Sequence, residues 1–217
     1  MIFKDEFLSF ISQTNEDKRV FLTLGPEGTS SKQATDALSA VFPAQVRLYP
    51  TYENAAEAIA TDPTNRALIV ANAYAAINRF YISNALIPVA AFFHDTPAYV
   101  IATRCERALG QDTLTVASHP APRHLIDDAL NRPGLSVVEA DSTHSAAEFV
   151  VNGLADACLT TQVAAHMLGL ETVTTALPTI PMLWTIFISK DHEEWRQKAL
   201  LCCPKPCPSA SKPTSQP

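Results

Sequence analysis

Short apolar strands alternate with helical patterns along most of the chain, and this order restarts once. In the first series, Arg19–Leu24 has the composition of a strand and leads through a Gly-Pro-Glu-Gly turn into a helix with one apolar face. A second series begins near residue 98, and a final apolar strand, Leu183–Ser189, follows it. Alternating strands and helices are typical of α/β architecture. The sequence therefore predicts an α/β fold with two lobes.

The remaining elements set the expected boundaries. The other predicted strands are residues 46–49, 67–71, 87–93, 98–103, 114–117, 135–140 and 155–159, and the predicted helices include residues 121–130, 143–151 and 161–168. We expect lobe 1 to span residues 19–97, completed by a returning strand within 177–190, and lobe 2 to span 98–176. Ligands of open α/β folds bind outside the carboxyl ends of the strands, so we expect a cleft between the lobes.

The two ends of the chain differ from this pattern. Residues 1–18 carry Phe3, Phe7 and Phe10 at helical spacing, which predicts an amphipathic helix that packs on the body or on a second subunit of a homodimer. Residues 191–217 are rich in Pro, Ser and Lys without periodicity, and we expect them to be mostly disordered. The start lacks a signal-peptide pattern, and no apolar run reaches the roughly 18 residues of a membrane span. We therefore expect a cytoplasmic protein.

Charge and cysteine content exclude several classes of partner. The formal net charge is -6, so nucleic acid and anionic membrane are poor partners. Cys105 and Cys158 stand alone in apolar surroundings and are expected in the core. Cys202, Cys203 and Cys207 lack His or acidic partners at zinc spacing. We expect no metal and no cofactor, and a small anion would have to be held by local hydrogen-bond donors.

Three strand-to-helix junctions carry such donors. They are Thr29-Ser30-Ser31, Ser118-His119 and Ser142-Thr143-His144. A helix N-terminus offers unpaired N–H groups and a partial positive charge, which also favours the neutral form of a nearby histidine. Each hydroxyl taken singly could be an ordinary N-cap. Three such junctions facing one cleft would bind a small dianion.

A second group of polar residues follows the strand at 67–71. It contains Asn72, Tyr74, Arg79 and Tyr81 within a short loop, which could also be a surface loop with packed aromatic rings. Arg79 is the best candidate for a bidentate contact with a carboxylate, and Arg104 is a weaker one.

A third group lies on the last strand. Met182 and Trp184 could form the wall beside an apolar ring or fill the core, and Thr185 is the polar residue between them and Ile186. The sequence shows neither a Gly-x-Ser-x-Gly elbow nor a Cys with a plausible His partner, so it offers no nucleophile motif.

Taken together, these motifs resemble those of the prephenate dehydratase-like family. The resemblance covers about residues 19–190 and rests on Gly25-Pro26-Glu27-Gly28-Thr29, Ser118-His119-Pro120 and Asp141-Ser142-Thr143 with Ala146-Ala147. It implies two α/β lobes like those of a periplasmic binding protein, with prephenate in the cleft between them.

The chain departs from the dehydratase pattern in ways that resemble a branch of the family. Where dehydratases carry Thr-Arg-Phe, this chain has Thr185-Ile186-Phe187, and Leu183 replaces the usual Asn. Ala73-Tyr74, Phe80-Tyr81 and Ile180-Pro181-Met182-Leu183-Trp184 are similar to the prephenate decarboxylases of natural-product pathways such as those to bacilysin and aeruginosin.

The resemblance implies a cofactor-independent, non-aromatising prephenate decarboxylase. It would release CO2, protonate the ring and keep the ring hydroxyl, giving a dihydro-4-hydroxyphenylpyruvate. A dehydratase must instead protonate that hydroxyl, so we expect the apolar Ile186 and Leu183 to withhold acid from it. The alternatives are a prephenate dehydratase and a non-catalytic small-anion binding protein.

The expected roles of the residues follow from this hypothesis. Thr29, Ser30, Ser31 and Arg79 would hold the anionic ends of prephenate, Ser118 and Thr143 its pyruvyl group, and Met182 and Trp184 its ring. Asn72, Arg104, His119 and Ser142 are further candidates for substrate binding. Tyr74, Tyr81 or His144 would supply the ring proton unless water does so. The resemblance implies a catalytic role for Thr185.

Overall fold

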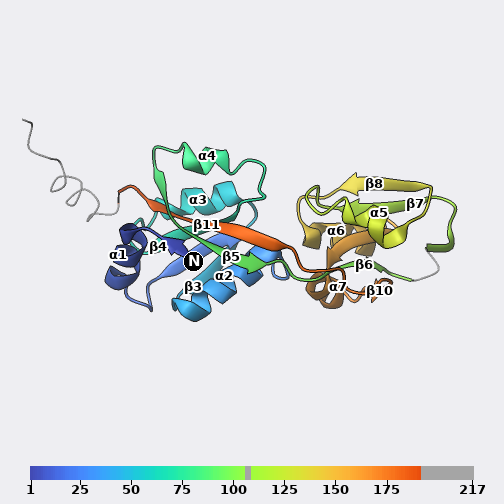
Figure 1. Cartoon of the computed structure of the whole chain (residues 1–217), viewed down its shortest axis with the longest axis horizontal. Coiled ribbons are helices and arrows are strands. Elements are labelled where there is room, and N and C mark those ends of the chain that lie inside the picture. Colours follow the sequence, from blue (N-terminus) through green and yellow to red (C-terminus); the bar gives the residue numbers. More distant parts are fainter. Residues whose placement is uncertain (106–108, 192–217) are drawn as a thin grey trace, which may run out of the picture.

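The computed structural model describes residues 1–105 and 109–191, and their strands form two sheets. The two sheets and their helices lie one beyond the other along the long axis of the molecule (Figure 1). We use lobe 1 for the six-stranded sheet with its helices and lobe 2 for the five-stranded sheet with its helices.

Lobe 1 contains both the first and the last strand of the described chain. Its strand order is β1-β5-β11-β4-β2-β3, with β2 parallel to β3 and β4, and β11 antiparallel to β4 and β5. Its elements are β1 (Ile2–Phe3), α1 (Asp5–Gln13), β2 (Val20–Leu24), α2 (Ser30–Val41), β3 (Gln45–Tyr49), α3 (Tyr52–Ile59), β4 (Arg66–Ala71), α4 (Asn78–Tyr81), β5 (Leu86–Asp95) and β11 (Pro181–Ser189).

Lobe 2 lies between β5 and β11 in the chain. Its strand order is β10-β6-β9-β7-β8, with β7 parallel to β8 and β9. Its elements are β6 (Tyr99–Thr103), β7 (Leu114–Ser118), α5 (Leu125–Leu130), β8 (Leu135–Glu139), α6 (Thr143–Val151), β9 (Ala157–Thr161), α7 (Gln162–Met167) and β10 (Glu171–Thr172). Because β11 returns to pair with β4 and β5, the chain crosses between the lobes twice.

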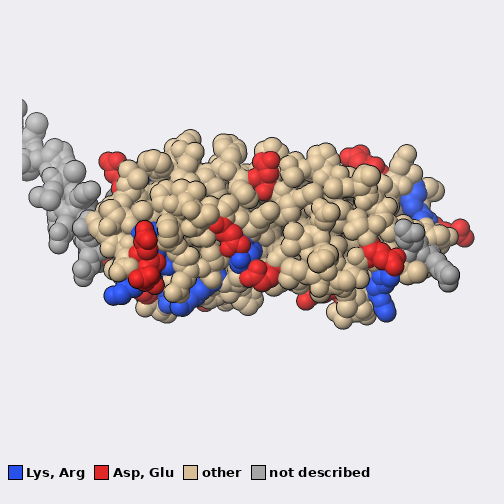
Figure 2. Space-filling view, turned by 90° about the horizontal axis from the view of Figure 1, so that it is seen from below, with Lys and Arg blue, Asp and Glu red and all other residues tan. Residues whose placement is uncertain are grey.

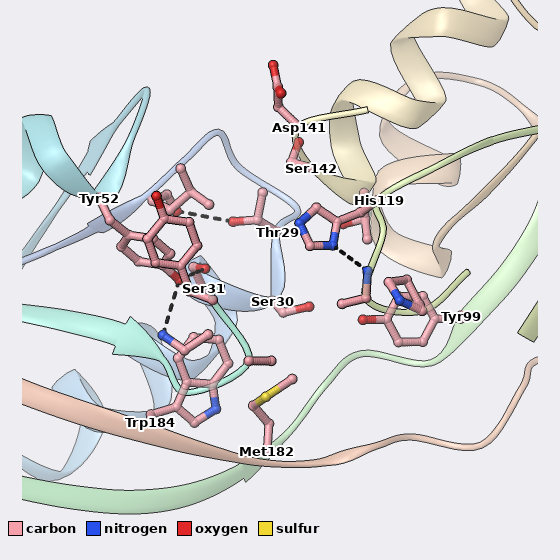
Figure 3. Close-up of a pocket in the computed structure, with 17 residues that line it drawn as sticks. Thr29, Ser30, Ser31, Tyr52, Tyr99, His119, Asp141, Ser142, Met182 and Trp184 are labelled. Carbon is pink, nitrogen blue, oxygen red and sulfur yellow. Dashed lines mark hydrogen bonds between the residues drawn. The ribbon is translucent and has the colours of Figure 1, made fainter. Parts of the chain in front are cut away.

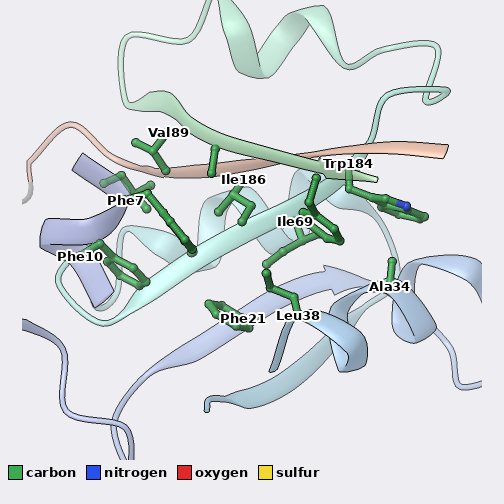
Figure 4. Packing of buried hydrophobic residues seen from close by; sticks show 13 residues of the cluster. Phe7, Phe10, Phe21, Ala34, Leu38, Ile69, Val89, Trp184 and Ile186 are labelled. Atoms are coloured by element: carbon green, nitrogen blue, oxygen red, sulfur yellow. The ribbon is translucent and has the colours of Figure 1, made fainter. Parts of the chain in front are cut away.

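Helices α1 and α2 cover one face of the first sheet. Phe7 and Phe10 of α1 are 0% exposed and pack in one cluster with Ile69, Trp184 and Ile186 (Figure 4). The N-terminal helix therefore packs on its own lobe, and its buried Phe side chains are not available to a second subunit. The helix is also shorter than the predicted residues 1–18, because Ile2–Phe3 pairs with β5 instead.

Other sequence predictions also need correction. The segment around Arg79, expected to be a loop, forms the short helix α4. Helix α5 begins at Leu125 rather than at residue 121, after a series of turns that includes Pro122, which has no backbone N–H to donate. Cys105 is exposed and is not a core residue, whereas Cys158 is buried. The predicted disorder of 191–217 concerns a segment of which residues 192–217, with Cys202, Cys203 and Cys207, lie outside the described residues.

Within the described ranges, no helix combines the length and the apolar character that a membrane crossing requires. Charged side chains are scattered over the face seen in Figure 2, with wide uncharged areas between them.

Candidate active site

A pocket lies where the two lobes meet, and its walls come from both of them. Lobe 1 contributes the N-terminus of α2, the first residue of α3, the ends of β2 and β4, and β11, while lobe 2 contributes β6 and the loops after β7 and β8 (Figure 3). The lining residues are Leu24, Thr29, Ser30, Ser31, Tyr52, Ala71, Ala73, Tyr74, Tyr99, His119, Ala121, Pro122, Asp141, Ser142, Thr143, Met182 and Trp184.

Two helix N-termini face this pocket. Thr29 caps α2 by accepting a hydrogen bond from the Lys32 N–H at 3.2 Å, and Ser142 caps α6 by accepting one from the Ser145 N–H at 2.9 Å. The capping roles are therefore real, yet both caps also line the pocket. The remaining N–H groups of a first helical turn have no partner within the helix, so the two ends together form a region that favours an anion.

Buried phenols complete the polar wall. The Tyr52 hydroxyl lies 2.7 Å from that of Ser31 and accepts a hydrogen bond from the Ala71 N–H at 3.3 Å. Tyr99 begins β6 in lobe 2 and lines the same pocket as Ser30 of lobe 1. Burial raises the pKa of both phenols above the ordinary value, so both stay protonated at neutral pH.

The opposite wall is apolar. Trp184 is 1% exposed and its indole Nε1–H donates to the His94 carbonyl at 3.0 Å, which fixes the orientation of the ring. Met182 lies two residues earlier on the same face of β11, as the period of a strand requires. Both side chains line the pocket while packing against the core of lobe 1, so the two roles considered from the sequence coexist.

Tyr74 is the predicted catalytic residue that lines the pocket. Its hydroxyl donates to Glu53 Oε1 at 2.8 Å, and Arg79 binds the same oxygen at 2.7 Å. Burial and the contact with Glu53 raise the pKa of Tyr74 to about 12. Burial alone would raise the pKa of Glu53, but the hydrogen bonds from Tyr74 and Arg79 lower it below its usual value.

The two arginines predicted to hold substrate lie outside the lining. The Arg79 side chain is 61% exposed and forms an ion pair with Glu53, so it contacts the site only through that carboxylate. Arg104 follows the end of β6 and is exposed. Among the residues that do line the pocket there is no Lys or Arg, and Asp141 is the one carboxylate.

Thr185 lies on the face of β11 opposite to Trp184. Its hydroxyl donates to Asn72 Oδ1 at 2.7 Å and lies 2.9 Å from the Tyr81 hydroxyl. A threonine hydroxyl has one proton, so Tyr81 is the donor in the second bond. The structure thus brings Asn72, Tyr81 and Thr185 together in one hydrogen-bonded chain, but none of the three lines the pocket.

Ser118 and His144 also lie outside the lining, although each is next to a residue that belongs to it. Ser118 is fully buried and donates to the carbonyl of His119 at 2.8 Å. His144 is buried, with Nε2 3.8 Å from Glu148 and Nδ1 without a hydrogen-bond partner among the described residues.

The expectation that Ile186 and Leu183 withhold acid from the ring hydroxyl needs correction. Ile186 is 0% exposed in the cluster with Phe7 and Phe10, and Leu183 does not line the pocket either. Side chains at these positions therefore cannot withhold acid from a ligand by surrounding it. Ile186 contributes to the core of lobe 1.

Several lining residues were not predicted to belong to a site. They are Leu24, Tyr52, Ala71, Ala73, Tyr99, Ala121, Pro122 and Asp141. Asp141 directly precedes the Ser142 cap, so its position in the motif was a usable signal. Tyr52 and Tyr99 gave no such signal, because they look like core residues of a helix and a strand.

The described residues contain no group of three or more His, Cys, Asp or Glu side chains that could hold a metal ion. The residues that line the pocket offer hydroxyls, phenols, helix N-termini, Asp141 and the His119 imidazole.

Solved structures share the fold at low sequence identity. A prephenate dehydratase from Arthrobacter aurescens in complex with L-Phe superposes with a TM-score of 0.61 and 16% identity, over 78% of this chain and 60% of that one. The periplasmic VFT2 domain of BvgS from Bordetella pertussis gives 0.50 and 15%, over 93% and 94% of the two chains. These likenesses show a fold of the prephenate dehydratase and periplasmic-binding type, as predicted.

Curated relatives match more closely in sequence. No family model matches the chain. A prephenate decarboxylase from Bacillus amyloliquefaciens is 34% identical over 174 residues, which cover 76% of this chain and 84% of the relative. One from Planktothrix agardhii (strain NIVA-CYA 126/8) is 33% identical over 177 residues, or 77% and 87% of the two chains. The chain therefore belongs to the prephenate decarboxylase family.

Proposed function

We propose that this protein decarboxylates prephenate without aromatising it, releasing CO2 and leaving a dihydro-4-hydroxyphenylpyruvate. The observation that carries the proposal is a pocket between the lobes in which two helix N-termini face an apolar wall of Met182 and Trp184. Prephenate has the matching composition, with two carboxylates at its ends and an apolar diene ring between them.

The proposed orientation places the anionic groups at the two helix starts. One carboxylate lies at Thr29, Ser30 and Ser31, and the pyruvyl group lies at Ser142 and Thr143, so the substrate spans the lobes. The diene ring then lies against Met182 and Trp184. Arg79 acts on this site through Glu53 and Tyr74 rather than by direct contact.

The diene replaces a cofactor as the electron sink. As the ring carboxylate leaves as CO2, its bonding electrons move into the diene, and a proton is added to a ring carbon beside the carbinol. We assign this proton to Tyr74, which lines the pocket, rather than to Tyr81 or His144, which do not. The Tyr74 hydroxyl turns from Glu53 to the ring carbon for the transfer, and the phenolate recovers a proton from water. A phenol with a pKa of about 12 can protonate a carbanion but is a poor acid for a leaving hydroxyl, so the hydroxyl stays in place.

The experiment is direct. Purified protein is mixed with prephenate without added cofactor, and the products are followed by absorbance and mass. Loss of CO2 with the ring hydroxyl retained supports the proposal. Phenylpyruvate would identify a dehydratase, and tight binding without turnover would identify a small-anion binding protein.

We further propose that the enzyme works in the cytoplasm and forms a homodimer. Its mass in solution tests the second point. Exposed apolar side chains at the first strand, such as Ile2 at 78% and Phe3 at 46%, are the surface we expect to be covered in a dimer, and a monomeric mass would contradict it.

A further inference from the structure

The pocket contains no obvious cation for its substrate. Lys32, in the first turn of α2, pairs with Asp36 at 2.5 Å and with Glu27 at 3.4 Å, and Arg79 pairs with Glu53. Among the lining residues, His119 is the one side chain that could carry a positive charge near neutral pH. Its protonation state therefore decides whether the site holds a cationic acid in addition to the Tyr74 phenol.

The backbone fixes the tautomer of His119. Its Nδ1 accepts a hydrogen bond from the Ala121 N–H at 3.2 Å. A ring nitrogen that accepts a hydrogen bond carries no proton, so the neutral ring bears its proton on Nε2. Figure 3 shows this bond and the other ring nitrogen turned toward Thr29, on the opposite side of the ring.

Protonation of the ring would be opposed at this position. An imidazolium carries a second N–H on Nδ1, which would point at the Ala121 N–H and replace a hydrogen bond with a repulsive contact. The carboxylates of Asp141 and Glu139 favour the charged ring. Arg123 lies 4.0 Å from Glu139 and offsets the effect of that carboxylate. The Tyr99 phenol in the same pocket is neutral. Burial outweighs the two carboxylates and lowers the pKa of His119 below its ordinary value.

We propose that His119 remains a neutral imidazole throughout turnover and donates its Nε2–H to an oxygen of the bound substrate. This inference rests on the proposed function and adds the reason for its outcome. An imidazolium beside the substrate would be an acid strong enough to help the ring hydroxyl leave, and the ring would become aromatic. A neutral imidazole binds the oxygen without transferring a proton, so the hydroxyl is retained.

The state of the ring can be measured without any substrate. Histidine labelled with ¹⁵N is followed by NMR in the full-length protein between about pH 5.5 and 8, the range in which a histidine normally titrates. We expect His119, assigned by its absence in His119→Gln, to show the Nε2–H tautomer at pH 7 and to become charged at a lower pH than an ordinary histidine. An imidazolium signal for His119 at pH 7 would overturn the inference.

Two variants of matched polarity test the donor. The amide nitrogen of Gln can take the place of Nε2, whereas that of Asn lies near Nδ1. We expect His119→Asn to lose on the order of 10- to 100-fold in kcat/KM for prephenate, the effect of a hydrogen bond to a charged group, and His119→Gln to lose clearly less than His119→Asn. Equal losses in both variants, with unfolding midpoints like that of the parent protein, would contradict a donor at Nε2.

A third variant removes the backbone hydrogen bond to His119 Nδ1. Ala121→Pro deletes the N–H that donates to His119 Nδ1. Ala121 is the second residue of a turn closed by the hydrogen bond from the Arg123 N–H to the Pro120 carbonyl, and proline is favoured at that position of a turn. We expect NMR to show a raised His119 pKa and the product to include phenylpyruvate increasingly as the pH falls. Unchanged product while NMR shows imidazolium would refute the link between this residue and the outcome.

These experiments distinguish a failure of this inference from a failure of the proposed function. If the parent protein fails to convert prephenate, the proposed function fails while the NMR result still decides the state of His119. If the parent protein makes the hydroxylated product but His119 is charged or replaceable by Asn, this inference alone fails.

Discussion

The Thr161 hydroxyl donates a hydrogen bond to the Gly28 carbonyl at 3.0 Å and so joins the end of β9 in lobe 2 to the turn before α2 in lobe 1. The same hydroxyl accepts from the Ala164 N–H at 3.1 Å and caps α7. Gly28 directly precedes Thr29, the first hydroxyl of the pocket wall. The contact therefore helps to set the separation of the two helix N-termini that we propose bind the substrate.

Gly28→Ala tests whether this contact matters for activity. Gly28 has φ of +81°, and an added Cβ would lie 3.2 Å from the Met167 sulfur and 3.5 Å from the Ala164 Cα. We expect the variant to lose about 1–2 kcal/mol of unfolding free energy because an L-residue is strained there, and kcat/KM to fall as the lobes shift. Urea unfolding and prephenate turnover measure the two effects.

Gly153→Ala is the matched control. Gly153 has φ of +71°, and a Cβ added there would meet open space, so the variant experiences a similar backbone strain at a residue outside the pocket lining. We expect a similar loss of stability with unchanged kcat/KM. Equal activities of the two variants would show that the contact between Gly28 and α7 does not tune the site.

Tyr74→Phe tests the proposed proton donor. We expect kcat to fall by about 10²-fold or more, in the range of general acid catalysis, with a small change in KM. Tyr81→Phe is the control, because that phenol does not line the pocket, and it is expected to retain kcat within a few fold. A Tyr74→Phe enzyme that keeps its rate would leave water as the proton source.

The pH dependence of Tyr74 follows from its neighbours. The pKa rises from 10.0 to about 12, so the folded state holds the proton more tightly than the unfolded state. The stability that this provides is present below pH 10 and is lost as the pH rises toward 12. Absorbance titration of tyrosinate should show several tyrosines that titrate late, since burial also raises the pKa of Tyr52 and Tyr99, and one of them should disappear in Tyr74→Phe. Loss of a tyrosine that titrates normally in Tyr74→Phe would contradict the Glu53 contact.

Thr185→Val tests whether the hydroxyl on β11 acts on substrate. The family resemblance implies a catalytic role, whereas the structure gives its one proton to Asn72. We expect a loss of about 1 kcal/mol of unfolding free energy for the missing hydrogen bond, with kcat reduced by less than tenfold. Thr185→Ser, which keeps the hydroxyl, is the control. A loss of kcat beyond 10³-fold in Val but not in Ser would restore the catalytic role.

The α/β pattern was readable because it depends on local periodicity, and the two-lobed fold followed from it together with the motifs. Elements too short for periodicity were not readable, such as the two-residue β1 and the four-residue α4. The hydroxyls at the starts of α2 and α6 were readable, since an N-cap and an anion site require the same residue types.

The details of the site depended on contacts that sequence spacing does not encode. The ion pair of Arg79 with Glu53 joins residues 26 positions apart, and nothing local indicates it. Strand alternation, by contrast, could have shown that Thr185 and Trp184 face opposite sides of the sheet. The same alternation places Ile186 beside Trp184 in the core, which the motif comparison alone did not reveal.

Substitution of Trp184 separates its two roles. Trp184→Phe keeps an aromatic ring but loses the bond to the His94 carbonyl, so we expect a loss of about 1–2 kcal/mol in unfolding free energy. Trp184→Ala should cost about 3–5 kcal/mol of unfolding free energy, because the ring is buried with Ile69 and Ala34.

If the Trp184 ring also orders the diene of the substrate, KM for prephenate rises modestly in Trp184→Phe and strongly in Trp184→Ala. Phe92→Leu, in the same cluster but outside the lining, is the control for destabilisation alone. A KM in Trp184→Phe and Trp184→Ala no higher than in that control would mean that Trp184 only fills the core.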